Sequence, residues 1–233
     1  MGEAQRSRRA RQASASEHEH ERRAVSPPLV AVLDYGIGNL RSAQKALEHV
    51  GADARLTADP GLVREAAGVV LPGVGAFGAC MSALRRAGLE DLVHESVHSG
   101  RPFLGICVGM QMLFDGSEED ADAKGLGILP GVVRWIPTGV KVPQMQWNKL
   151  QIQRNDDPLF VGLGANDAWV YFVHSLHAVP DDPSVVAATC EYGATLNAAF
   201  RSANVFATQF HPEKSGRDGL RVLANFTDVC AAA

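Results

Sequence analysis

The sequence predicts an α/β protein: a doubly wound, mostly parallel sheet with flanking helices and a small antiparallel extension. Three observations support this fold class. Continuous apolar runs, among them Leu29–Leu33 and Phe103–Ile106, are typical of strands that are buried on both faces. Segments whose apolar residues recur at helical spacing lie between these runs, as the βαβ units of a parallel sheet require. Residues 126–200 instead contain short strand-like pieces separated by turns, which favours antiparallel pairing there.

The alternation of strand and helix begins at Leu29–Leu33. The next helix is expected where four apolar residues recur at helical spacing, namely Leu40, Ala43, Leu47 and Val50. Asn39 is the expected N-cap of this helix, and Gly51 is the expected residue just past its end. Ala54–Thr57 and Val69–Leu71 follow as short strands.

Residues 78–99 then contain apolar residues at helical spacing, and a helix is expected over Met110–Phe114, with the strand Phe103–Ile106 between the two segments. Three short strands are expected in the antiparallel part: Val132–Ile136, Trp169–Val173 and Val185–Cys190. A strand over Asn204–Phe210 and a helix over residues 217–230 are expected to complete the domain.

The composition excludes several classes of protein. Of the 233 residues, 46% are hydrophobic and 21% are charged, which is typical of a globular chain and excludes a wholly disordered one. No apolar run approaches the roughly 20 residues that a membrane span needs. The formal net charge of −4 argues against a protein that binds nucleic acid by charge alone. Neither a membrane nor a nucleic acid is therefore an expected partner.

Residues 1–28 differ in composition from the rest. They hold six of the 22 basic and four of the 26 acidic residues, so residues 29–233 carry 16 basic against 22 acidic side chains. Their only large aliphatic residues are Met1 and Val25, so they cannot bury enough apolar area to offset the entropy of ordering. The sequence therefore predicts a disordered tail over residues 1–28 and one domain over residues 29–233.

The chain has four cysteines: Cys80, Cys107, Cys190 and Cys230. They form no C-x-x-C pair, and no signal-peptide segment precedes them, so a reducing, cytoplasmic setting is expected. No metal site and no cofactor are expected. Three of the thiols are interpreted as packing residues, and Cys107 is the candidate nucleophile.

Cys107 lies in the segment Gly105-Ile106-Cys107-Val108-Gly109, between a predicted strand and a predicted helix. A nucleophile elbow needs small residues on both sides, because the nucleophile occupies a tight strand-to-helix turn. Such a turn holds the side chain clear of the sheet and points the Val108 amide at the reacting carbonyl. The helix N-terminus beside the sulfur favours the thiolate. By itself, the fragment is equally consistent with a buried structural cysteine.

A base for this thiol is expected in Gln209-Phe210-His211-Pro212-Glu213, directly after a predicted strand. Residues just past the carboxyl ends of the strands in a doubly wound sheet converge on one crevice, so His211 can meet Cys107 there. Glu213 can turn back to hold the second imidazole nitrogen and fix its tautomer. A lone His after a strand is more often a surface or capping residue, but its combination with Glu213 and a cysteine elbow favours catalysis.

The third component is the glycine-rich segment Leu71–Gly78, which also follows a predicted strand. Its glycines allow backbone N–H groups to approach a ligand closely, as an oxyanion hole needs. An ordinary loop is the alternative. A phosphate-binding loop is disfavoured because the Lys and the Ser or Thr of a P-loop are absent.

The cysteine elbow, the glycine-rich loop and the H-P-E segment together resemble the class I (triad) glutamine amidotransferases. The resemblance extends from Val30 to the C-terminus and implies the flavodoxin-like fold of that class. Six segments are similar, more narrowly, to the glutaminase subunits of imidazole glycerol phosphate synthases: Asp34–Leu40, Gly105–Gln111, Gly125–Gly127, Val142–Asn148, Tyr171–Ser175 and His211–Gly216.

This resemblance implies a reaction. Cys107 attacks the side-chain amide of L-glutamine, and His211 protonates the departing ammonia. His211 then activates the water that hydrolyses the thioester, while Glu213 orients the imidazole. The residues implied in binding are Val108 with Val74 or Gly75 for the oxyanion, and Gln111, Glu119, His174, Ser175 and Leu176 for the glutamine.

The resemblance also implies a partner. Family members pass ammonia to a (β/α)₈-barrel cyclase subunit, which uses it on a phosphoribulosyl-formimino carboxamide ribotide in histidine biosynthesis. The products are imidazole glycerol phosphate and an aminoimidazole carboxamide ribotide. The residues that resemble the docking face of the family are Asn39, Ser42, Trp147 and Lys214. Taken without the resemblance, Lys214 would be interpreted as a solvated charge and Trp147 as a packing residue.

The sequence departs from the family pattern at several points. Members usually read P-H-M-G-W-N, where this chain has Gln144 and Gln146 on either side of Met145. Leu176 occupies a place often held by an aromatic residue, and the tail over residues 1–28 is atypical. None of these departures touches the triad, but the two glutamines can alter the gate between the two active sites.

Three other functions stay open on the sequence alone. The first is another triad amidotransferase, such as an anthranilate- or pyridoxal-phosphate-synthase glutaminase, against which the W-N segment and the Lys after H-P-E argue. The second is a free-standing cysteine hydrolase of γ-glutamyl peptides, which would turn over fully without a partner. The third is a binding module without catalysis, which the presence of all three triad residues disfavours.

Overall fold

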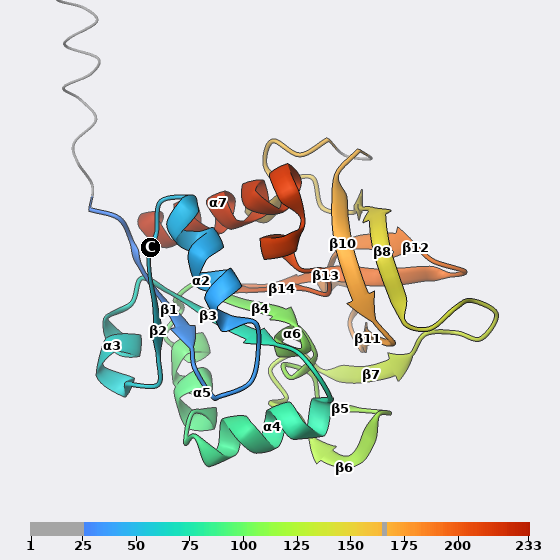
Figure 1. Ribbon diagram of the computed structural model, residues 1–233, viewed down its shortest axis with the longest axis horizontal. Helices are drawn as coiled ribbons and strands as arrows, with labels where there is room; N and C mark the ends of the chain where they lie inside the picture. Colours follow the sequence, from blue (N-terminus) through green and yellow to red (C-terminus); the bar gives the residue numbers. More distant parts are fainter. Residues whose placement is uncertain (1–25, 165–166) are drawn as a thin grey trace, which may run out of the picture.

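The computed structural model of the chain describes residues 26–164 and 167–233. Its main sheet has eight strands in the order β2-β1-β3-β4-β14-β13-β12-β9. Helices lie on both faces of this sheet (Figure 1). This is the doubly wound α/β arrangement that the sequence predicts. The tail predicted over residues 1–28 lies, up to residue 25, outside the described residues.

Five neighbouring strands of the main sheet are parallel. They are β1 (Leu29–Leu33), β2 (Asp53–Thr57), β3 (Gly68–Gly73), β4 (Phe103–Cys107) and β14 (Val205–Thr208). β3 and β4 are buried along their whole length, which explains why they appear in the sequence as continuous apolar runs. The carboxyl ends of the parallel strands meet at one edge of the sheet, where doubly wound proteins bind their ligands.

The helices of the parallel part are α2 (Leu40–His49), α3 (Pro60–Glu65), α4 (Phe77–Arg86), α5 (Glu90–His98), α6 (Val108–Gln111) and α7 (Gly216–Ala232). α2 packs against α7, and α3 packs against α5 on the other face of the sheet (Figure 1). The first predicted helix is confirmed as α2, which starts after Asn39 and is followed by Gly51 with a φ of +103°. The Asn39 side chain makes no capping bond to the helix and instead accepts a hydrogen bond from the Ser42 hydroxyl (2.8 Å).

The helical structure predicted within residues 78–99 is confirmed, and the chain forms two helices there, α4 and α5. Gly88 adopts a φ of +68° after α4, and the Leu89 amide donates back to the Leu84 carbonyl (3.2 Å). This is the glycine-dependent helix ending that a left-handed residue allows. The apolar spacing continues across the break because both helices bury their apolar faces against the same sheet.

The helix predicted over Met110–Phe114 is wrong in extent, since α6 ends at Gln111. Beyond it the Leu113 carbonyl accepts hydrogen bonds from the amides of Ile128 (2.8 Å) and Leu129 (2.9 Å). Pairing with a distant segment therefore replaces the helical hydrogen bonds. The predicted last strand and last helix are confirmed as β14 and α7, with ends shifted by one or two residues.

The antiparallel part both extends the main sheet and forms small sheets of its own, the two arrangements that the sequence leaves open. β13 (Thr195–Ser202), β12 (Val186–Glu191) and β9 (Gln151–Ile152) extend the main sheet beyond β14. β8 (Gln144–Lys149) pairs with β10 (Trp169–His174). β11 (Leu176–Pro180), β7 (Gly131–Trp135), β5 (Gly116–Ser117) and β6 (Asp120–Lys124) form a four-stranded sheet. Short 3₁₀ helices are η1 (Pro158–Phe160), η2 (Pro183–Val185) and η3 (Pro212–Lys214).

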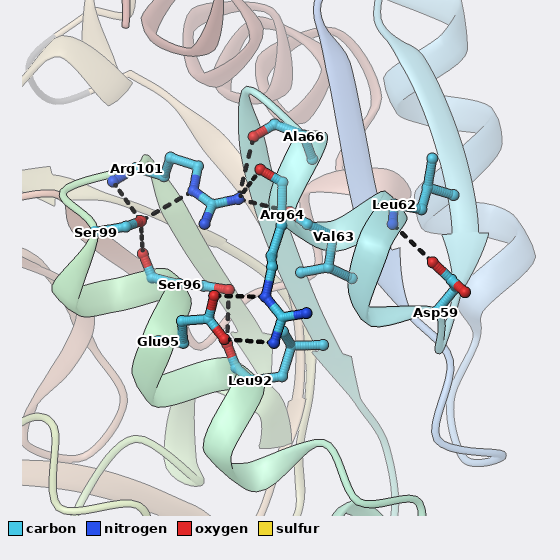
Figure 2. A network of polar contacts seen from close by, with 10 residues as sticks. All are labelled: Asp59, Leu62, Val63, Arg64, Ala66, Leu92, Glu95, Ser96, Ser99 and Arg101. Carbon is cyan, nitrogen blue, oxygen red and sulfur yellow. Dashed lines mark hydrogen bonds and ion pairs between the residues drawn. The ribbon is translucent and has the colours of Figure 1, made fainter.

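Polar contacts hold α3, a helix that the sequence did not predict, against α5 (Figure 2). The Asp59 carboxylate accepts a hydrogen bond from the Leu62 amide (2.8 Å) and caps the N-terminus. The Arg101 guanidinium donates to the carbonyls of Val63 (2.6 Å) and Arg64 (2.9 Å) at the other end. The α3 helix is therefore defined by its caps, because Val63 is its only buried residue.

Three of the four thiols pack in the interior and have no catalytic role. Cys80, Cys190 and Cys230 are buried and unpaired. A side chain on Gly68 would collide with the Cys230 sulfur, which shows how closely α7 approaches β3. Within residues 26–164 and 167–233, no helix is long and apolar enough to cross a membrane.

Candidate active site

Cys107 lies at the turn between β4 and α6. Its backbone has a φ of +55° and a ψ of −114°, a region that residues other than glycine rarely adopt. Gly109 lets the elbow close, because a Cβ there would collide with the Leu71 carbonyl of β3. The chain therefore has the strained strand-to-helix turn of a nucleophile elbow. Only 4% of Cys107 is exposed, so the sulfur meets little solvent.

His211 follows β14, the parallel neighbour of β4, so its imidazole reaches the elbow from the adjacent strand end. Its Nδ1 lies 2.8 Å from Oε1 of Glu213, and both side chains are buried. Burial by itself lowers the pKa of His211, but its contacts with the Cys107 sulfur and the Glu213 carboxylate outweigh burial and raise the pKa to about 9. At neutral pH the elbow sulfur therefore faces an imidazolium, the environment in which cysteine nucleophiles react as thiolates.

The glycine-rich loop lies against the elbow. The register of β3 with β4 pairs Gly73 with Cys107, and Val74 and Gly75 come next in the chain. The Tyr35 hydroxyl donates to the Pro72 carbonyl (2.6 Å), and the Cys80 thiol donates to the Val74 carbonyl (3.3 Å). Two buried side chains thus hold the loop by its carbonyls, and Val74 and Gly75 line the same cavity as the Cys107 sulfur.

A cavity of about 460 Å³ opens beside Cys107 and His211. It is lined by every residue predicted for the oxyanion and the glutamine: Val74, Gly75, Val108, Gln111, Glu119, His174, Ser175 and Leu176. Its volume is in the range of small-molecule sites and accommodates a free amino acid. Of the predicted docking residues, Asn39 and Lys214 also line it, whereas Ser42 and Trp147 do not.

Gln209 is a site residue that the sequence reasoning missed. Its amide Nε2 lies 3.8 Å from the Cys107 sulfur, and its Oε1 accepts a hydrogen bond from Gln111 (3.0 Å). The Gln111 amide also reaches the Leu176 carbonyl (3.4 Å). Its position in the sequence, between the last strand and His211, was the one indication of a site role. That position did not predict the role, because no sequence pattern distinguishes an amide side chain in a site from one that only packs.

The polar side chains around the cavity differ in charge. The Glu119 carboxylate lines the cavity and accepts a hydrogen bond from the Phe77 amide at the start of α4 (2.7 Å). His174 is instead neutral at neutral pH, because burial lowers its pKa to about 4. Its Nδ1 lies 2.7 Å from the Leu176 carbonyl and its Nε2 lies 2.9 Å from Oε1 of Gln144.

The departures from the family pattern have different surroundings. Gln144 is fully buried next to His174, Gln146 is exposed, and Leu176 is buried. The predicted docking residue Trp147 is 47% exposed on β8, with its ring edge-to-face against Tyr171. Among the described residues, no group of three or more His, Cys, Asp or Glu side chains is arranged to hold a metal ion.

Comparison with known proteins identifies the family. The model of the family described as "Glutamine amidotransferase class-I" matches residues 31–229. A protein named "Imidazole glycerol phosphate synthase subunit HisH" from Syntrophotalea carbinolica is 51% identical over 208 residues, which cover 86% of this chain and 100% of that one. The chain belongs to the class I glutamine amidotransferases and, within them, to the HisH subunits.

Other HisH subunits are similarly close. The subunit from Synechococcus elongatus is 50% identical, and the alignment covers 90% of this chain and 97% of that one. The subunit from Methanothermobacter thermautotrophicus is 48% identical, and the alignment covers 88% of this chain and 100% of that one. Among solved structures, PurLQS from Thermotoga maritima aligns with a TM-score of 0.70 at 22% identity and covers 87% of this chain and 98% of that chain. A structure described as a glutamine amidotransferase aligns with a TM-score of 0.68 at 23% identity, with 86% and 98% covered. These structural likenesses establish the class I amidotransferase fold of the HisH chain.

Proposed function

We propose that the chain is the glutaminase subunit of imidazole glycerol phosphate synthase in histidine biosynthesis. It hydrolyses L-glutamine to glutamate and ammonia and passes the ammonia to a cyclase subunit. The observation that carries this proposal is the pairing of Cys107 with the His211–Glu213 couple at the wall of an amino-acid-sized cavity. About 50% identity to HisH subunits over nearly their whole length supports this function over that of another triad amidotransferase.

The first half of the reaction forms a thioester. The Cys107 thiolate attacks the side-chain carbonyl carbon of glutamine, and the C–S bond forms as the carbonyl π electrons move to oxygen. His211, protonated at neutral pH because its pKa is about 9, then gives a proton to the departing nitrogen as the C–N bond breaks. Ammonia leaves, and the γ-glutamyl group stays on sulfur.

The second half releases glutamate. In the thioester the sulfur no longer carries a negative charge, so one of the two contacts that raise the pKa of His211 is lost. The imidazole, neutral after giving up its proton, accepts one from water as the water attacks the thioester carbonyl. The C–S bond breaks, and the thiolate and the imidazolium are restored. Glu213 holds Nδ1 throughout, so Nε2 is the nitrogen that moves protons.

Backbone amides stabilise the oxyanion of both steps. The Val108 amide belongs to the first turn after the elbow, and either Val74 or Gly75 supplies the second donor from the opposing loop. Losing one such donor costs about 10²–10³ in rate. The hydrogen bonds from Tyr35 and Cys80 to the loop carbonyls support the oxyanion-binding role of the loop, because they hold its amides in place and a preorganised donor need not reorient during the reaction.

The cavity wall suits the rest of the glutamine molecule. Glu119 is the anionic group available to the substrate α-ammonium, and the Gln111 amide is available to the reacting side chain. The backbone of His174–Leu176 would hold the α-amino and α-carboxylate groups. A neutral His174 fits this assignment, since it adds no charge beside the zwitterion.

Docking of the (β/α)₈-barrel cyclase is proposed at the mouth of the same cavity, through Asn39, Ser42, Trp147 and Lys214. Lys214 is adjacent to the catalytic Glu213 and lines the cavity, so a partner that contacts it also covers the site. Met145 (62% exposed) and Trp147 (47%) present large apolar side chains on β8, as expected of a docking surface. The four unpaired thiols are consistent with a cytoplasmic location.

The test is a glutaminase assay on the chain alone, with the cyclase subunit, and with the cyclase subunit plus its nucleotide ligand. We expect weak hydrolysis alone and strong stimulation in the full mixture. Cys107→Ala should abolish glutamine-dependent synthesis while ammonia-dependent synthesis by the complex continues. Full activity of the isolated chain would instead identify a free-standing hydrolase, and the absence of stimulation would overturn the proposal.

A further inference from the structure

Gln144 is a fully buried polar side chain that the reaction does not use. It lies on β8 directly opposite His174 on β10, in the register of the antiparallel pair. Its amide oxygen is 2.9 Å from Nε2 of His174, and its amide nitrogen has no hydrogen-bond partner. A buried amide costs free energy unless it is hydrogen-bonded, so this contact with His174 requires an explanation.

The partners of His174 decide which way the amide faces. Nδ1 lies 2.7 Å from the Leu176 carbonyl, which can only accept, so Nδ1 carries a proton. In the neutral imidazole Nε2 is then an acceptor, and it needs a donor. As placed, the Gln144 Oε1 and the His174 Nε2 are both acceptors. Turning the Gln144 amide by 180° brings its NH₂ group to Nε2, so that a donor faces this acceptor. The Leu176 carbonyl thus sets the Nδ1–H tautomer, and the Gln144 amide stabilises it by donating to the nitrogen that this tautomer leaves as an acceptor.

The Leu176 carbonyl connects this pair to the catalytic centre. It also accepts from the Gln111 amide (3.4 Å), which donates to Gln209 (3.0 Å), whose amide in turn lies 3.8 Å from the Cys107 sulfur. All of these side chains are buried. The series is continuous, so the orientation of the His174 ring affects the backbone and the amides that face the cavity.

We propose that Gln144 is a positioning residue of the glutamine site: by donating to Nε2 of His174 it holds the Nδ1–H tautomer and thereby fixes the Leu176 carbonyl and the backbone of residues 174–176. The kinetic part of this proposal rests on the proposed glutaminase function. The tautomer of His174 does not, since it is a property of the folded chain.

Two substitutions separate hydrogen bonding from packing. Gln144→Leu places an apolar side chain of similar size at this position and removes the donor, so Nε2 of His174 loses its hydrogen-bond partner. Gln144→Glu keeps the shape but offers only acceptors, so Nε2 must be protonated, and Nδ1–H still reaches Leu176. Gln153→Leu is the matched control, because it makes the same change at an exposed position that does not line the cavity.

Kinetics are measured on the complex with the cyclase subunit. We expect Gln144→Leu to raise the KM for glutamine about five- to tenfold with kcat within about twofold, as loss of one hydrogen bond in a binding site predicts. Gln144→Glu should stay within about threefold of the unchanged chain in both constants, and Gln153→Leu should match the unchanged chain. A kcat loss in Gln144→Leu with KM unchanged would overturn the positioning role.

The tautomer is read from ¹⁵N-histidine spectra of the full chain, with the His174 signals assigned by their absence in His174→Asn. We expect a protonated Nδ1 and an unprotonated Nε2 in the unchanged chain, and two protonated nitrogens in Gln144→Glu. An Nε2–H tautomer in the unchanged chain would overturn the proposal even if Gln144→Leu does not fold. A confirmed tautomer in a complex without glutaminase activity would instead show that the proposed function is wrong.

Discussion

His211 is held between a sulfur and a carboxylate that both favour its protonated form. Since its pKa is about 9, the imidazolium persists through neutral pH, beside the sulfur that attacks the substrate. Glu213→Gln removes one of the two stabilising contacts, so the pKa of His211 falls. We predict that kcat for glutamine falls about 10²–10⁴-fold in this variant.

The same substitution changes the pH dependence of Cys107 alkylation by a glutamine-mimicking electrophile. In the unchanged chain the rate should vary little between pH 6 and 8, because His211 beside the sulfur stays protonated over this range. In Glu213→Gln the pKa of His211 is lower, so the imidazole loses its proton within this range and the rate should change with pH. Glu191→Gln, an exposed carboxylate, is the control. Identical profiles for Glu213→Gln and the unchanged chain would contradict the proton-holding role of Glu213.

The backbone at Cys107 stores strain that the elbow needs. A φ of +55° with a ψ of −114° costs a residue with a Cβ about 1–3 kcal/mol, and glycine escapes most of this cost. We therefore predict that Cys107→Gly unfolds at a higher temperature than Cys107→Ala, by roughly 2–4 °C for about 1 kcal/mol in a chain of this size. Both variants lack the sulfur, so the difference isolates the backbone. Equal melting temperatures would show that the elbow is unstrained.

The triad could be predicted from the sequence because its members are close to strand ends whose convergence is a property of the fold class. Cys107 ends β4, and His211 and Glu213 follow β14, the next strand of the sheet. Gln209 and Gln144 could not be predicted in the same way. Their roles depend on side chains from other strands, and a buried amide has no sequence pattern of its own.

At the scale of elements, the elbow and the glycine-rich loop act together because β3 and β4 are adjacent. Gly109→Ala would place a Cβ against the Leu71 carbonyl and push the elbow and the glycine-rich loop apart. We predict a loss of about 10²-fold or more in kcat, the effect of one misplaced oxyanion donor. Gly116→Ala is the matched control, because its nearest contact would be an ordinary 3.6 Å to the Ala123 carbonyl. A Gly109→Ala variant with full activity would show that the close approach is dispensable.

Arg101 holds the C-terminus of α3. Its Nη1 donates to the Arg64 carbonyl and to the Val63 carbonyl, which also accepts from the Ala66 amide (3.3 Å) (Figure 2). We predict that Arg101→Ala destabilises the fold by about 1–2 kcal/mol, or roughly 2–8 °C in melting temperature. Arg86→Ala, which removes a single exposed contact to Ser82, should shift the melting temperature much less. Similar shifts for the two variants would contradict the capping role.

The elements that the sequence did not predict share a physical cause. α3 has one buried residue, so it leaves no apolar period, and its stability comes from Asp59, Arg101 and their backbone partners. The break at Gly88 was hidden because the apolar spacing continues through it. The antiparallel pairings join segments far apart in the chain, and local patterns indicate that such strands exist but not which ones pair.

At the scale of the whole molecule, the cavity lies where the parallel sheet meets the β8–β10 pair, so residues from both parts line it. Cys107, His211 and the glycine loop belong to the parallel sheet, and His174 belongs to β10. A partner that binds across this junction contacts both parts at once. That arrangement gives the cyclase a physical route to influence hydrolysis, because it can bias the backbone next to the substrate without touching the nucleophile.

Trp147 and Trp135 allow a direct test of where the cyclase binds. Both indoles are about half exposed, at 47% and 49%, but Trp147 is on β8 beside the cavity and Trp135 is on β7 of the four-stranded sheet. Buried aromatic anchors contribute about 2 kcal/mol or more to an interface. We therefore predict that Trp147→Ala raises the Kd for the cyclase subunit at least about 30-fold in calorimetric titration.

Trp135→Ala should leave that Kd unchanged, because it removes the same side chain from another surface. Circular dichroism of both variants checks that the fold is retained, which the exposure of the two rings leads us to expect. Equal weakening by the two substitutions would mean that exposed tryptophans stabilise the fold rather than the complex. Weakening by Trp135→Ala alone would place the cyclase on the four-stranded sheet instead of on β8, and the proposed docking residues would then be wrong.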